Sequence, residues 1–280
     1  MAANWTTQAA GTGAYADVNG VHLYYETHGE PRDGTVPLIL LHGGLGSGEM
    51  FGPVIPALAT TRQVIAVDLQ GHGRTADVDR PLTPTAMAGD IAGLVRHLGL
   101  AEVDLLGYSL GGGAALFTAL AHPDLVRKLI LVSVYARPDA IDPAIRGQQG
   151  QMDAAAAELM KGTPMYQTYM RLAPRPDDFP RLLEKLGAFM ADPFDFSDEV
   201  RSLQVPTMLV SADADMAPPS HSVELFALLD GGLRDGGWMG ENRPKGGHAL
   251  AILPGLQHYD IFASPLLVSV AVAFLDAPPG

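Results

Sequence analysis

The chain has 280 residues, 47% of them hydrophobic and 18% charged, with a formal net charge of −13 at pH 7 and no cysteine. This length fits one large α/β domain or a domain with an insert, and no apolar run reaches the ~20 residues that span a bilayer. The acidic charge disfavours nucleic acid and anionic membranes as partners, and the lack of cysteine excludes disulfides, thiolate catalysis and cysteine-ligated zinc.

The N-terminal segments predict a sheet that begins antiparallel and continues parallel. The first twenty residues lack a basic segment followed by an apolar one, so we expect no signal peptide and a soluble, cytoplasmic protein. The dipeptide Asn19-Gly20 interrupts an alternating stretch and is typical of a tight hairpin. Two apolar segments, "VPLILLHGG" (36–44) and "QVIAVDLQGHG" (63–73), predict buried strands that each end in a glycine loop.

The glycine loop after the first of these strands is a candidate source of an oxyanion donor. Its backbone can approach a substrate closely, which exposes the amide of Gly44 or, as an alternative, that of Leu45. Phosphate binding is another use of such glycines, but the loop lacks the G-x-x-x-x-G-K-[ST] pattern. Only Asp68, at the end of the next strand, keeps a dinucleotide-binding fold open as an alternative.

The stretch "VDLLGYSLGGGAAL" (103–116) predicts a strand, a sharp turn and a helix around Ser109. A helix with apolar residues at helical spacing precedes it and begins at Thr83-Pro84. The pattern G-x-S-x-G in this context is typical of a nucleophile elbow, in which a strained turn exposes the serine hydroxyl above a sheet. The amide of Leu110, at the start of the helix, would be the second oxyanion donor. The alternative is that Ser109 merely caps the helix.

Residues 136–204 interrupt the alternation of strands and helices after the strand "RKLILVSV" (127–134) and show helical patterns only. We interpret them as a helical lid, inserted into a core formed by residues 1–135 and 205–280. We expect part of the lid's flexible and aromatic side chains to pack helix on helix and the rest to cover a cleft over Ser109. These side chains are Met152, Met160, Met165, Tyr166, Tyr169, Met170, Phe179, Phe189 and Met190.

A serine nucleophile needs a base, and the base needs a carboxylate that holds its other nitrogen. His258 is the best placed histidine, because it follows the carboxyl end of the last predicted strand, "HALAILPG" (248–255), where ligands collect in α/β sheets. His248 would lie at the opposite edge. Asp213 and Asp215 both follow the strand "VPTMLVSAD", and the spacing favours Asp215 as the partner of His258.

The remaining histidines have other expected places. His42 falls in a turn where a hydrogen bond from the ring to the backbone is common. Four others are expected at the surface, in helices or loops: His72, His97, His122 and His221. The glycine-rich excursion at 231–247 is interpreted as a linker or mobile loop rather than as a binding site around Trp238.

Five segments in this order make the chain similar to the α/β-hydrolase superfamily, most of all to serine carboxylesterases and cofactor-free haloperoxidase-like enzymes. They are "HGG" at 42, "DLQGHGRT" at 68, "GYSLGG" at 107, "ADADMAPP" at 212 and "LPGLQH" at 253. The resemblance implies an α/β fold with a mostly parallel eight-stranded sheet flanked by helices and a helical cap after the sixth strand. It also implies catalytic roles for Ser109, Asp215 and His258, with Gly44 and Leu110 as the oxyanion hole.

The functional prediction is a serine hydrolase that cleaves carboxylic esters of small, mainly apolar substrates through an acyl-enzyme. We expect no cofactor and no metal, a small-molecule ester as the partner, and a homodimer as an open alternative. The other functions considered are a perhydrolase or carbon–carbon bond hydrolase that uses the same three residues, and a ligand-sensing protein on the same fold.

Overall fold

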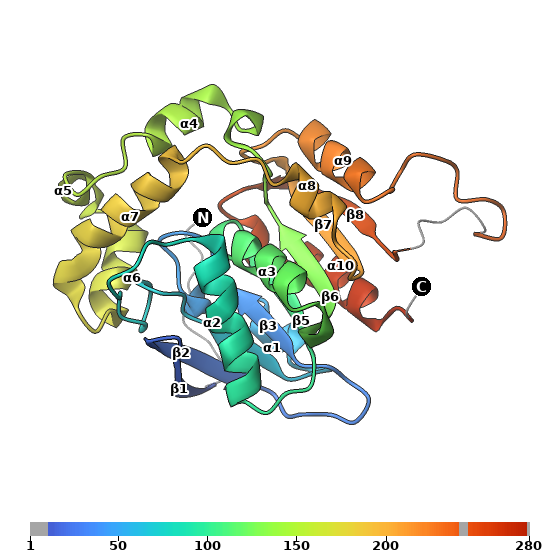
Figure 1. Ribbon diagram of the computed structural model, residues 1–280, viewed down its shortest axis with the longest axis horizontal. Helices are drawn as coiled ribbons and strands as arrows, with labels where there is room; N and C mark the ends of the chain where they lie inside the picture. Colours follow the sequence, from blue (N-terminus) through green and yellow to red (C-terminus); the bar gives the residue numbers. More distant parts are fainter. Residues whose placement is uncertain (1–10, 241–245, 279–280) are drawn as a thin grey trace.

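The computed structural model describes residues 11–240 and 246–278, and its centre is one eight-stranded sheet (Figure 1). The strand order is β1-β2-β4-β3-β5-β6-β7-β8. The two outer pairs β1–β2 and β2–β4 are antiparallel and all other pairs are parallel, so the predicted fold class is confirmed. The strands are β1 Thr12–Val18, β2 Val21–His28, β3 Leu38–Leu41, β4 Val64–Val67, β5 Val103–Tyr108, β6 Val126–Val132, β7 Thr207–Ala214 and β8 Ala249–Gln257.

Each face of the sheet is covered by helices, because its central strands are apolar on both sides. In β3, Ile39 and Leu41 face the cluster that contains helices α2 and α3, whereas Leu38 and Leu40 face the cluster that contains α1 and α10. This alternation follows from the two-residue period of a strand. The helices of the core are α1 Ile55–Leu58, α2 Pro84–His97, α3 Leu110–Ala121, α9 Pro219–Leu228 and α10 Pro265–Asp276.

Several predicted turns and helix starts are present as expected. Asn19 and Gly20 have positive φ angles of 47° and 78° and connect β1 to β2. The side chain of Thr83 accepts a hydrogen bond from the amide of Ala86 at 3.1 Å and so caps α2. Of the predicted loop at 231–247, residues 241–245 lie outside the described part of the chain, and Trp238 is exposed.

Five helices lie between β6 and β7, in the segment predicted as the lid (Figure 1). They are α4 Pro143–Gln149, α5 Ala156–Met160, α6 Pro164–Leu172, α7 Phe179–Ala191 and α8 Ser197–Arg201. Helices α4 to α7 project from the core as one group, whereas α8 lies back beside α9. The helical patterns expected for this segment are thus present.

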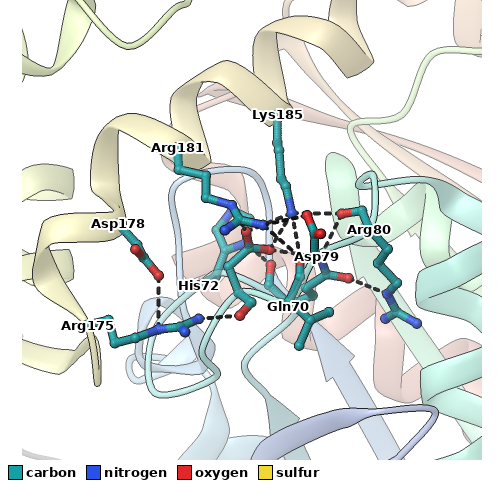
Figure 2. Close-up of polar contacts among 10 residues, drawn as sticks. Gln70, His72, Asp79, Arg80, Arg175, Asp178, Arg181 and Lys185 are labelled. Atoms are coloured by element: carbon teal, nitrogen blue, oxygen red, sulfur yellow. Dashed lines mark hydrogen bonds and ion pairs between the residues drawn. The ribbon is translucent and has the colours of Figure 1, made fainter.

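A buried carboxylate of the core anchors the lid. Asp77, in the segment between β4 and α2, is buried, and its Oδ2 lies 2.7 Å from Nζ of Lys185 and 2.8 Å from Nε of Arg181 on α7. Gln70 donates to its other oxygen, Oδ1, at 2.8 Å. Figure 2 shows Arg175, Arg181 and Lys185 pointing from the lid toward this segment. The position of α7 over the core is therefore set by charge as well as by apolar packing.

Asp77→Asn should loosen the lid without unfolding the sheet. The substitution removes the counter-charge of two lid cations, and breaking a buried ion pair costs roughly 3 kcal/mol. We expect limited proteolysis within α5 to α7 to be at least about tenfold faster, because cleavage follows the population of the open form. Asp79→Asn is the matched control, since the Asp79 side chain is fully exposed and, among the described residues, forms an ion pair with Arg181 alone. Equal cleavage rates in the two variants would contradict the anchoring role of Asp77.

In the part of the chain that the structure describes, no helix is both long enough and apolar enough to cross a membrane.

Candidate active site

Ser109 lies in a strained turn between β5 and α3, as the sequence predicts. Its φ of 52° and ψ of −117° define a backbone conformation that residues with a side chain rarely adopt. The flanking glycines permit this turn, because a Cβ atom at Gly107 would lie 2.3 Å from the carbonyl oxygen of Gly111. A Cβ at Gly111 would lie 2.3 Å from that of Leu41. The backbone itself therefore requires glycine on both sides of Ser109.

The alternative interpretation of Ser109 as a helix cap is wrong. The residue stands at the N-cap position of α3, but its hydroxyl makes no capping hydrogen bond. The equivalent hydroxyls of Thr83, Thr163 and Ser264 do cap their helices. Ser109 instead lines a large cavity.

His258 and Asp215 are joined by a hydrogen bond at the same edge of the sheet. Nδ1 of His258 lies 2.8 Å from Oδ1 of Asp215, and both side chains are almost fully buried. His258 comes directly after β8 and Asp215 directly after β7, whose carboxyl ends meet because the two strands are parallel. The hydroxyl of Tyr108 donates to the carbonyl oxygen of His258 at 2.7 Å, which fixes the backbone of the loop.

Asp215 is held in its ionised form. Burial alone would raise its pKa, but hydrogen bonds from His258 and Ser133 outweigh burial and lower it. The Ser133 hydroxyl donates to Oδ2 at 2.5 Å, and the amide of Ala212 donates to the same atom at 3.1 Å. Sequence reasoning missed Ser133, although it follows β6 at the same edge of the sheet. An ionised Asp215 holds the proton of His258 on Nδ1 and leaves Nε2 free to accept one.

The two competing residues, Asp213 and His248, lie elsewhere. Asp213 is exposed, and its carboxylate accepts the amide of Gly255 at 2.9 and 3.0 Å, so it supports β8 at a glycine with a φ of 70°. His248 precedes β8, and its Nδ1 accepts the amide of Thr207 at 3.2 Å at the amino end of β7. The structure thus brings Asp215, and not Asp213, to His258.

The loop that carries Gly44 and Leu45 lies directly beside Ser109. A Cβ at Gly43 would be 3.3 Å from Cβ of Ser109. Both Gly44 and Leu45 line the cavity, and Leu45 has a φ of 59°. Among the described residues, the amides of Gly44, Leu45 and Leu110 donate no hydrogen bond, so each is available to a substrate oxygen. The geometry keeps both Gly44 and Leu45 as candidates beside Leu110.

His42 rigidifies this loop through its ring, as expected. Nδ1 donates to the carbonyl oxygen of Gly43 at 2.7 Å, and Nε2 accepts the amide of Leu69 at 3.0 Å. Complete burial and the neighbouring His72 ring lower the pKa of His42 to about 3, so the ring stays neutral and keeps both bonds. The carboxylate of Asp68, which accepts the amide of Gly48 at 2.7 Å, holds the far end of the same loop.

A cavity of about 1250 Å³ lies between the core and the lid, and Ser109 and His258 both line it. Its walls are mainly apolar. Of the nine lid side chains singled out in the sequence, five line the cavity: Met152, Met160, Met165, Phe189 and Met190. The buried Tyr169 and Phe179 instead pack inside the lid. Some side chains of this set therefore pack and others line the cavity, and more of them line it than the third that we expect from the sequence.

Sequence reasoning did not find the charged residues of the cavity. Glu49, in the short helix after the glycine loop, accepts hydrogen bonds from Arg74 at 2.5 Å and from Arg171 on α6 at 2.6 Å. Burial opposes its ionisation, but the two arginines outweigh burial and lower the pKa of Glu49. Glu49 and Arg171 both line the cavity, so an ion pair between core and lid forms part of its wall. Residues this far apart in sequence carry no local pattern that could have shown the pairing.

Two of the histidines expected at the surface are buried instead. His72 donates from Nδ1 to the carbonyl oxygen of Gln70 at 2.9 Å, and His221 accepts the amide of Ala136 at 3.1 Å. Each satisfies a backbone group that turns inward, which a sequence pattern does not reveal. Within residues 11–240 and 246–278, no group of three or more potential ligands could hold a metal ion.

Comparison with known proteins agrees with this fold. A family model described as alpha/beta hydrolase fold matches residues 36–251. A protein of Azorhizobium caulinodans named "Putative carbamate hydrolase RutD" is 31% identical over 239 residues, which are 79% of this chain and 86% of the relative. A protein of the same name from Caulobacter sp. is 40% identical, but over only 42% of this chain and 44% of its own length. The structure of the enol-lactonase from Burkholderia xenovorans superimposes with a TM-score of 0.69 at 22% identity, over 94% of this chain and all of the other.

Proposed function

The chain belongs to the α/β hydrolase fold family and is a hydrolase, and from this premise we propose that it cleaves carboxylic esters as a serine hydrolase. The observation that carries the proposal is the buried hydrogen bond between Asp215 and His258, beside a cavity into which Ser109 projects from a strained turn. A strained turn of this kind persists only when the surrounding structure supports it, and such turns cluster at functional sites.

In the proposed mechanism, Oγ of Ser109 attacks the ester carbonyl carbon while Nε2 of His258 takes the hydroxyl proton. The negative charge that develops on the carbonyl oxygen is stabilised by the amides of Leu110 and Gly44. Collapse of the tetrahedral intermediate breaks the ester bond, and His258 returns its proton to the departing alcohol. Water then attacks the acyl-enzyme in the same way, which releases the acid and restores the Ser109 hydroxyl. Asp215 stays ionised throughout and stabilises the imidazolium.

A carbamate substrate is the second candidate, because two relatives carry the name carbamate hydrolase. A carbamate presents the same acyl carbon to Ser109, and the mechanism differs only in the nitrogen bound to that carbon. Matched pairs distinguish the two candidates, since an alkyl carbamate and an ester of the same alcohol differ in this one group. A perhydrolase would instead form peracid from the acyl-enzyme when peroxide is supplied.

Ser109→Ala should lower turnover about 10⁴- to 10⁶-fold with the fold intact. Labelling by a fluorophosphonate reports the same residue directly, because the reagent forms a bond with an activated serine. We expect labelling to be abolished in Ser109→Ala and in His258→Ala and kept in the matched control His248→Ala, whose ring lies at the opposite edge. Unchanged ester hydrolysis by Ser109→Ala would refute the assignment, and a wild-type protein that binds esters without labelling would be a ligand-sensing protein.

Asp215→Asn should reduce kcat about 10⁴-fold, because an amide cannot hold the imidazole in its productive tautomer. Asp213→Asn is the control for the same chemical change two residues away and should leave kcat within a few fold of the wild type. Steady-state kinetics on one ester measures both. Equal losses in the two variants would show that Asp213 acts on the site as well.

The apolar cavity should favour neutral substrates. We expect a higher kcat/KM for medium-chain or aryl esters than for acetates, because burial of a larger apolar group against the cavity walls stabilises the complex more. We also expect a lower kcat/KM for esters with a free carboxylate, because the net charge of −13 repels anions. A panel of esters of one common alcohol measures this preference. A strict requirement for a dicarboxylate ester, or a preference for a peptide or phosphate substrate, would overturn it.

A further inference from the structure

Four aromatic side chains that line the cavity form a ladder of neighbouring rings. Tyr135 follows β6, Phe189 lies on α7, and Phe194 and Phe196 lie between α7 and α8. The ring of Phe194 is central, with centroids 6.1 Å from Tyr135, 6.2 Å from Phe189 and 4.6 Å from Phe196. The planes in these three pairs differ by only 28°, 13° and 19°. The ladder therefore consists of nearly parallel rings contributed by both core and lid.

These rings line the cavity and also pack against the core, since Phe189 and Phe196 contact its apolar cluster and Phe196 lies edge-on to Phe117 at 5.0 Å. All four border the cavity that holds Ser109, and each is only half-buried. Tyr135 and Phe194, together with Gln149 and Met190, also border a second cavity of about 310 Å³. The lid has a further group of aromatic rings around Phe179, which is 1% exposed and does not line the cavity.

Stacked rings recognise another ring more strongly than they recognise an aliphatic group of equal size. Offset or edge-on aromatic pairs contribute beyond the burial of their apolar area, whereas a cyclohexyl group gains from burial alone. The methionines on the lid side of the cavity, such as Met160 and Met165, do not make this distinction, because a thioether adapts to many shapes. The cavity therefore combines a group of rings that selects for planar groups with thioethers that tolerate varied shapes.

We propose that the ladder of Tyr135, Phe189, Phe194 and Phe196 is a subsite for an aromatic ring of the substrate. The inference rests on the proposed function only in that the ligand is the ester cleaved at Ser109. The substrates of that site are then esters that carry an aryl group in the acid or the alcohol portion.

Two ester series test the subsite. In one, phenylacetate and cyclohexylacetate share an alcohol, and in the other, benzyl and cyclohexylmethyl alcohol share an acid. The readout is the ratio of kcat/KM for the phenyl and cyclohexyl members, which is independent of the fraction of active enzyme. Phe194→Leu keeps apolar bulk and removes the central ring, and it should lower this ratio roughly two- to tenfold in at least one series. The control Met165→Leu changes a cavity residue outside the ladder and should leave the ratio within twofold.

A binding measurement separates failure of the subsite from failure of the ester assignment. Ser109→Ala should bind 2-phenylacetamide more tightly than 2-cyclohexylacetamide in calorimetry, and adding Phe194→Leu should remove that difference. Ring-dependent binding without ester hydrolysis would support the subsite and refute the proposed reaction. Ser109-dependent ester hydrolysis with phenyl to cyclohexyl ratios unchanged by Phe194→Leu in both series would overturn the subsite and leave the proposed reaction standing.

Discussion

The close approach of β3, β5 and α3 around Ser109 is the constraint on which the site depends. Ser109 can hold a φ of 52° only because Gly107 and Gly111 leave the backbone room to turn, and each would clash with a neighbouring carbonyl oxygen if it carried a Cβ. The same approach brings the loop after β3 beside the serine, since Gly43 lies against it. A nucleophile and its candidate oxyanion donors therefore come from one packing arrangement, and the parallel sheet adds Asp215 and His258 by ending β7 and β8 at the same edge.

Much of this arrangement is predictable because it is local or follows from topology. The turn at Ser109 is a five-residue pattern, and the choice of His258 over His248 needs only the direction of the last strand. The choice of Asp215 over Asp213 requires knowing which of the two carboxylates points inward. This depends on the irregular pairing of β7 with β8 just before Asp215. Spacing favoured the residue that the structure brings to His258, but only the hydrogen bond at 2.8 Å distinguishes it from a neighbour that binds Gly255.

The features that sequence reasoning missed are pairings between distant residues. Ser133 meets Asp215 across 82 positions, and Arg171 meets Glu49 across 122. Neither pair has a periodicity or a motif, because each depends on how the lid and the strand ends are arranged in three dimensions. The burial of His72 and His221 has the same origin, since each ring bonds a backbone group whose direction is set by tertiary structure. Polar residues in buried positions are therefore what a sequence alone predicts least well.

Helix α7 connects the stability of the lid to the shape of the cavity. Lys185 binds the buried carboxylate of Asp77, and the adjacent Leu186 reaches the loop after β3, where its Cδ2 would contact a Cβ at Gly44 at 3.7 Å. One turn later, Phe189 and Met190 line the cavity. Because residues three to five apart on a helix keep a fixed relation, the ion pair at Lys185 also sets where the ring of Phe189 lies. A lid held only by apolar contacts could slide over the core, whereas the buried charge of Asp77 fixes the position of α7 over Ser109. The ion pair of Asp77 with Lys185 and the cavity wall formed by Phe189 and Met190 therefore move as one rigid element.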